Sequence, residues 1–110
     1  MGVVLVPILE GKLDAWKQWA AELKSSGDLA DLNSRYNLTR HAAWIVETPS
    51  GPAVIALHEG PGSDEFMQKI AGSDNEVDKR FKDGLMELHG MDITKPPPGP
   101  MPELFFDSGS

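Results

Sequence analysis

The stretch HAAWIVETPSGPAVIALHEG, residues 41–60, decides the fold of this chain. It consists of two short apolar runs joined by a Pro-Ser-Gly-Pro turn, and its residues alternate with the period of two that is typical of strands. A tight turn at Ser50-Gly51 would pair Thr48 with Ala53 and set the register of the hairpin. The stretch therefore predicts two antiparallel strands that follow each other directly in the chain.

Both faces of this predicted hairpin are apolar. One face carries the bulky residues Trp44, Val46, Ile55 and Leu57. The other carries small residues and two histidines: His41, Ala43, Ile45, Val54, Ala56 and His58. Helices on one side of a sheet can cover only one face, and monomers rarely leave a contiguous apolar patch open. We therefore expect a homodimer in which the bulky faces of two copies pack together across a two-fold axis. The alternative is the reverse assignment of the faces, which would place His41 and His58 at the dimer interface.

The flanking sequence predicts further strands and helices around the hairpin. Residues 2–9 are β-branched and apolar, which favours a strand, while residues 101–108 (MPELFFDS) predict a last short strand. Stripes at helical spacing predict a broken helical section before the hairpin and another after it, the last helix opening with a capping box at Ser73 and Glu76. The Pro-rich residues 95–102 read as an extended crossover.

The predicted order is thus βαββαβ, which is the order of the ferredoxin-like motif. We expect an α+β fold with a four-stranded antiparallel sheet and helices on one face, in one domain of residues 1–110.

Composition excludes several classes of function. The net charge is −7 and no basic cluster offsets it, which argues against nucleic acid as a partner. The chain has no cysteine, so disulfides, thiolate metal sites and cysteine nucleophiles are excluded. No apolar run approaches the roughly 20 residues of a membrane helix, and no basic region opens a signal peptide. We expect a cytoplasmic protein that does not bind membranes.

Three segments carry a resemblance to known proteins: AWKQWAAELK at residues 15–24, SDNEVDKRF at 73–81 and PELFFD at 102–107. They are similar to segments of a small family of short proteins without an established function. The element order and the two-faced sheet resemble the dimeric α/β-barrel superfamily of the ferredoxin-like fold. Within it, the chain looks most similar to that small family. This superfamily includes cofactor-free monooxygenases, haem-degrading enzymes, muconolactone isomerase-type enzymes and polyketide cyclases. The resemblance implies a pocket between sheet and helices in each subunit, but a fold alone does not choose among these activities.

His58 is the main candidate for chemistry. It lies beside small residues on its face, which leaves volume for a ligand next to a group that titrates near neutral pH. The alternative is a structural histidine at the rim of the sheet. His41 would be its diagonal neighbour, at about 7–8 Å between Cα atoms, which is too far apart for a metal pair. His89, beside Gly90, is expected to face solvent, which argues against a haem ligand. We predict no metal and no cofactor.

The remaining candidates would line a ligand pocket or be structural. Besides the two histidines, the predicted lining consists of Trp16, Trp19, Tyr36, Ala43, Ala56 and Phe66. Arg40 would orient a ligand carboxylate through two hydrogen bonds, although a salt bridge with Glu59 is the alternative.

The sequence predicts a homodimer that binds a small apolar or amphipathic molecule, such as a fatty-acid-like or aromatic acid. Whether it is an enzyme stays open: the superfamily suggests cofactor-free oxygenation or isomerisation with His58 as the acid–base group. The alternative is a dimer that only binds or serves a structural role.

Overall fold

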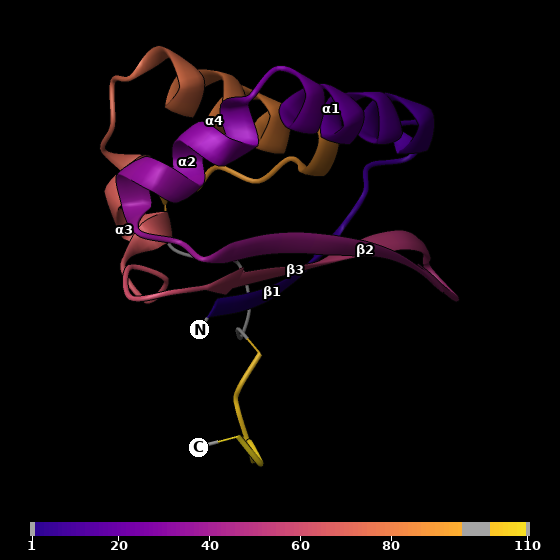
Figure 1. Cartoon of the computed structure of the whole chain (residues 1–110). Helices are drawn as coiled ribbons and strands as arrows, with labels where there is room; N and C mark the ends of the chain where they lie inside the picture. The colour runs from indigo at the N-terminus through magenta and orange to yellow at the C-terminus, as the bar shows by residue number, and fades with distance from the viewer. Residues whose placement is uncertain (1, 96–101, 110) are drawn as a thin grey trace.

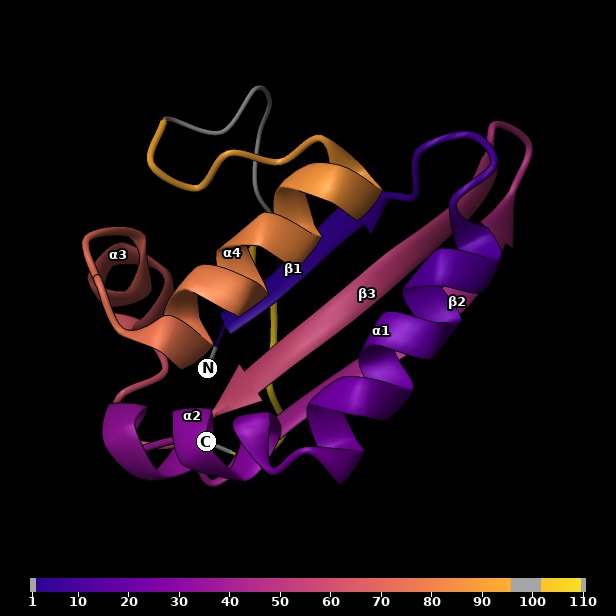
Figure 2. The same cartoon turned by 90° about the horizontal axis from the view of Figure 1, so that it is seen from above.

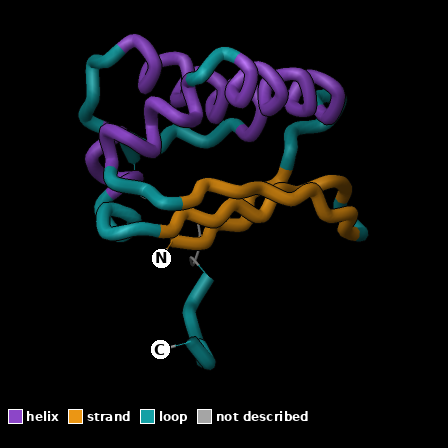
Figure 3. The backbone as a smooth tube through the Cα atoms, viewed as in Figure 1, coloured by secondary structure: helices purple, strands orange, loops and turns teal. Residues whose placement is uncertain are grey.

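A computed structural model describes residues 2–95 and 102–109 of the chain. A three-stranded sheet forms one layer and four helices cover one of its faces (Figures 1 and 3). In chain order the elements are β1 (Gly2–Pro7), α1 (Leu13–Ser25), α2 (Asp28–Tyr36), β2 (Arg40–Thr48), β3 (Gly51–Glu59), α3 (Phe66–Ala71) and α4 (Glu76–His89).

The sheet has the strand order β1-β3-β2, and both pairs of neighbours are antiparallel. The prediction of a four-stranded ferredoxin-like sheet is therefore wrong. Residues 102–109, which cover most of the predicted last strand, form no strand and are exposed. Their apolar run favours a strand, but strand propensity depends on packing against a neighbouring strand, and the side chains of this segment stay exposed. The predicted crossover at 95–102 lies mostly outside the described residues.

The register of the hairpin differs from the predicted one by two residues. Thr48 pairs with Gly51 rather than with Ala53, so the turn contains only the two residues between them. The Thr48 hydroxyl donates a hydrogen bond of 2.7 Å to the carbonyl oxygen of Gly51, which holds the turn closed. Because side chains alternate with a period of two, a shift of two residues leaves both predicted faces intact. Only the cross-strand partners change: Trp44 lies opposite Ile55, whereas the predicted register placed it opposite Leu57.

The face with the histidines and alanines is the one that the helices cover. Val54 on this face is buried in a cluster with Ile8, Trp16 and Leu88. The opposite face of the sheet carries exposed apolar side chains, which we call the open face: Val3 at 38%, Leu5 at 55%, Trp44 at 47% and Val46 at 36% exposure. No helix lies on this side of the sheet (Figure 1).

Seen from above, α4 lies over β1 and α1 lies over β2, while β3 runs between the two helices (Figure 2). A second cluster, which includes Leu32, Phe66, Ile70, Phe81 and Leu85, fills the end of the layer near α2 and α3. Val54 in β3 belongs to the first cluster, so β3 is the strand that contacts the core between α1 and α4.

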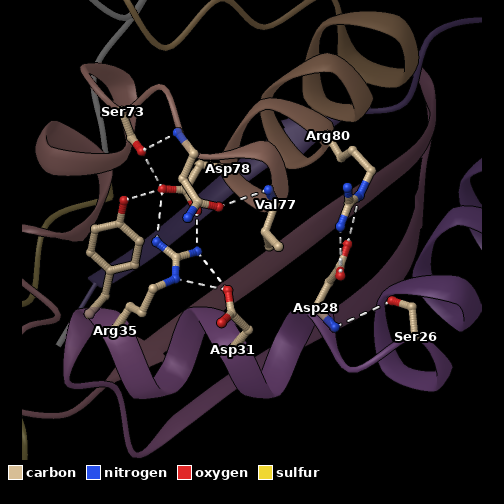
Figure 4. A network of polar contacts seen from close by, with 10 residues as sticks. Ser26, Asp28, Asp31, Arg35, Ser73, Val77, Asp78 and Arg80 are labelled. Carbon is tan, nitrogen blue, oxygen red and sulfur yellow. Dashed lines mark hydrogen bonds and ion pairs between the residues drawn. The ribbon is translucent and has the colours of Figure 1, made fainter.

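A buried carboxylate ties α2 to α4. The side chain of Asp78 is fully buried and accepts hydrogen bonds from the Arg35 guanidinium, the Tyr36 hydroxyl and the Ser73 hydroxyl (Figure 4). Ser73 therefore does not serve in the predicted capping box, because Asn75 caps α4 instead. Burial disfavours the ionised form of Asp78, but the hydrogen bonds from Arg35, Ser73 and Tyr36 outweigh this effect and lower its pKa to about 2.

Candidate functional site

Two histidines stand directly opposite each other on the helix-covered face. The observed register pairs His41 of β2 with His58 of β3, which makes them direct cross-strand partners rather than the predicted diagonal neighbours. Their ring centroids are 4.5 Å apart in an edge-to-face arrangement. The ring of Phe66 packs against both imidazoles, at 5.7 Å from His41 and 4.8 Å from His58. The pair is thus held between the sheet and α3.

The histidine pair borders a cavity of about 330 Å³ between the sheet and the helices. Ligand pockets typically have volumes of roughly 300–1,000 Å³, so this cavity is at the small end of that range. Its walls come from all three strands and from α1, α2, α3 and α4. The lining is mostly apolar and includes Val4, Val6, Trp16, Trp19, Ala20, Leu23, Ala43, Val54, Ala56, Met67, Phe81 and Leu85.

Both histidines of the pair are neutral at physiological pH. Burial lowers the pKa of His41 to about 4, and the neighbouring His58 contributes to this shift. Burial also lowers the pKa of His58 to about 4. A neutral imidazole offers one N–H donor and one nitrogen acceptor, so the pair can form directional hydrogen bonds without presenting a charge.

Two buried polar atoms belong to side chains that line the cavity and have no hydrogen-bond partner among the described residues. They are Nε1 of Trp16 and Nδ1 of His41. The indole nitrogen can only donate a hydrogen bond, whereas the role of the imidazole nitrogen depends on the tautomer. Leaving a buried polar group unpaired costs about 1–3 kcal/mol. Both atoms are almost inaccessible to solvent, so a bound group would pair with them only after the side chain rotates towards the cavity.

His89 also lines the cavity, which corrects the prediction that it faces solvent. It is buried in the last turn of α4, and its Nδ1 lies 2.8 Å from the carbonyl oxygen of Pro7. Burial lowers the pKa of His89, although the hydrogen bond to Pro7 opposes this effect. All three histidines of the chain therefore line the same cavity. Even so, no group of three or more potential metal-ligating side chains forms within residues 2–95 and 102–109.

The structure brings six of the nine predicted site residues to the cavity: Trp16, Trp19, His41, Ala43, Ala56 and His58. Three others lie elsewhere. Tyr36 bonds to Asp78, and Phe66 is fully buried in the core beneath the histidine rings. Arg40 is exposed, with Nη1 at 3.9 Å from the Glu59 carboxylate, and its guanidinium lies over the ring of Trp44 on the open face. Arg40 therefore lies outside the cavity lining.

Sequence reasoning also missed a cation. Lys24 is the one lysine or arginine among the described residues that line the cavity. Its position in the sequence carried a usable signal, because it lies four and eight residues after Ala20 and Trp16 on the same side of α1. As an exposed residue that touches the cavity, it lies at the rim rather than in the interior.

Comparison of the chain with protein-family models, with curated proteins and with solved structures finds no significant match. Among the described residues, no helix is long and apolar enough to cross a membrane. The function must therefore be argued from the site itself.

Proposed function

We propose that the chain binds a small, mostly apolar molecule carrying one hydrogen-bonding group in the cavity between the sheet and the helices. The observation that carries this proposal is the neutral His41–His58 pair on a cavity lining that is otherwise mostly apolar. Two lining side chains add an unpaired polar atom among the described residues, Trp16 Nε1 and His41 Nδ1, which a small side-chain rotation would bring to a ligand. Such a combination of apolar walls with a few polar groups is typical of ligand sites.

The ligand class follows from the charges around the cavity. The indole nitrogen of Trp16 can only donate a hydrogen bond, so a ligand group that pairs with it must accept one, as a hydroxyl, carbonyl or carboxyl group does. The neutral histidine pair supplies no positive charge, and Lys24 at the rim is the cation that a carboxylate would meet. An amphipathic acid or alcohol with a short aliphatic or aromatic body fits this arrangement.

Binding is favoured over acid–base catalysis. A general base is most effective when its pKa is near the working pH. The pKa of about 4 at His58 makes its imidazole a weak base at neutral pH, although it can still form hydrogen bonds. The proposal is therefore a binding protein in which the histidine pair recognises the ligand.

We also propose that the protein is a homodimer in which the open faces of two copies meet. Four exposed apolar side chains on one side of a sheet form the kind of contiguous patch that marks an interaction site. A two-fold axis would bury the same patch on both copies.

The proposal is tested on the purified full-length protein. Native mass spectrometry is expected to show a co-purified small molecule. Calorimetric titration with decanol and with decanoic acid then measures the affinity of two defined probes that differ only in the polar group. Because both histidines stay neutral down to about pH 5, the affinity for decanol should not change between about pH 8 and 5.5.

Variants separate the roles of the polar groups. His41→Phe keeps an aromatic ring but loses Nδ1, and it should weaken binding of both probes about 3- to 10-fold. Lys24→Gln should weaken only decanoic acid, while Lys17→Gln on the exposed side of the same helix should change neither affinity. The absence of a co-purified molecule together with no binding of either probe would refute the proposal.

A further inference from the structure

The chain carries a second exposed apolar surface besides the open face. In residues 102–107, which we call the tail, Leu104 is 71% exposed, Phe105 87% and Phe106 88%. The whole described segment 102–109 is exposed and forms no strand. Three consecutive large apolar side chains in water are unfavourable, since burying each contributes roughly 1.5–3 kcal/mol. The tail therefore has the composition of a segment that packs against something.

The tail lies on the same side of the molecule as the open face. It runs away from the sheet on the side opposite to the helices (Figures 1 and 3). Packed sheets lie about 10 Å apart. Eight extended residues span up to about 26–29 Å, so residues 102–109 of one copy are long enough to run along the edge of a second copy packed on the open face.

We propose that the tail of each protomer packs along the margin of its partner's open face, at the edge strands β1 and β2 beside the sheet-to-sheet contact, with Phe105 and Phe106 as the anchoring side chains. This inference rests on the proposed homodimer and names the contact that holds it together. Both surfaces belong to one chain, so a two-fold axis forms the contact between tail and open face twice in one dimer. A different partner would need to be complementary to both surfaces.

The area available agrees with a stable dimer. Buried aromatic side chains cover roughly 150–250 Å² each, so Phe105, Phe106 and Trp44 at their exposed fractions offer roughly 330–560 Å² per protomer, to which the exposed parts of the aliphatic residues Leu104, Val3, Leu5 and Val46 add. A standard interface buries about 800 Å² per partner. The open face alone would fall well short of this area, so the tail supplies the larger part.

Because the chain has no cysteine, single introduced cysteines report this contact directly. Full-length Phe105→Cys protein is mixed under mild oxidation with differently tagged protein carrying either Leu5→Cys or Trp44→Cys. A disulfide between the two kinds of chain is expected, and with one cysteine per chain it cannot form within a protomer. Met86→Cys replaces Phe105→Cys as the control, because Met86 is 46% exposed but lies on α4, on the helix side of the sheet.

Sedimentation measures the energetic part of the inference. The double substitution Phe105→Ser and Phe106→Ser should raise the dimer dissociation constant by about 30-fold or more, as expected for interface hot spots, while Met86→Ser should leave it unchanged. The role of the tail is refuted if the double variant dimerises with the wild-type dissociation constant and the Phe105→Cys protein gives no more cross-link than the Met86→Cys control. The proposed homodimer would remain valid in that case. A wild-type protein that sediments as a monomer at every concentration overturns both.

Discussion

The histidine pair makes the stability of this protein depend on pH in a defined window. Both imidazoles have a pKa of about 4 in the folded protein, against 6.5 for an ordinary histidine. Between these values the unfolded chain binds protons that the folded chain does not, so the free energy of unfolding must fall as the pH decreases from about 6.5 to 4. The loss of unfolding free energy is absent well above pH 6.5 and reaches its full size below about pH 4.

The size of the effect follows from the shifts. A difference of about 2.5 pKa units corresponds to roughly 3 kcal/mol for one histidine. The two rings are only 4.5 Å apart and His58 contributes to the shift of His41, so their titrations are coupled. We expect a combined loss of roughly 3–6 kcal/mol, which is a large part of the 5–15 kcal/mol typical of folded domains.

Urea unfolding followed by circular dichroism at several pH values from about 7.5 to 4 tests this expectation. His41→Gln and His58→Gln each remove one titrating group, so each variant should lose roughly half of the pair's contribution to the pH dependence. The buried His89, whose pKa is also lowered by burial, contributes alike in all three proteins. The carboxylates titrate alike in all three proteins, so the difference between the curves isolates the histidines. Unfolding free energies that stay level between pH 6.5 and 4 in the wild type, or variants that keep the wild-type slope, would refute the reasoning.

Three substitutions test other parts of the structure. Asp78→Asn should destabilise the protein by about 2–4 kcal/mol, and this effect should disappear as the pH falls from about 4 to 2. Asp28→Asn removes a partly exposed ion pair with Arg80 between the same two helices and should cost less, about 1 kcal/mol, in the same urea unfolding experiment. Gly84→Ala would place a Cβ atom 2.3 Å from Nε1 of Trp19, so it should lower the melting temperature despite the better helix propensity of alanine. Ala56→Leu should fill the cavity and abolish probe binding in calorimetry while the chain stays folded.

The sequence correctly predicted which side chains share a face of the hairpin, but it predicted the wrong cross-strand partners. Alternation fixes which side chains share a face, and this survives any shift by an even number of residues. The turn fixes the register, and Thr48 closes it two residues earlier than expected through its bond to Gly51. That shift brings His41 opposite His58, so the central contact of the site depended on a detail of the turn.

Contacts between distant parts of the chain escaped prediction. Asp78 resembles an ordinary acidic residue of a first helical turn, and only the fold brings it to Arg35, which is 43 residues away in sequence. His89 beside Gly90 has the sequence context of an exposed helix end, but its ring is fixed on the carbonyl of Pro7. The predicted fourth strand is wrong for a different reason. An apolar run indicates that a segment tends to be buried, but it does not indicate which surface the segment packs against.

Two features of the sheet lower the stability of the protein, and they lie on its opposite faces. On the covered face, Ala43 and Ala56 leave a cavity where larger side chains could pack, and the unpaired Nδ1 of His41 adds a further cost. On the open face, Leu5 and Trp44 remain in water. Features of this kind are expected at functional sites, where function compensates for lost stability. Because alternate residues of a strand point to opposite faces, substitutions on one face can remove ligand binding without touching dimer contacts on the other. The two proposed functions are therefore separable by mutation within a single strand.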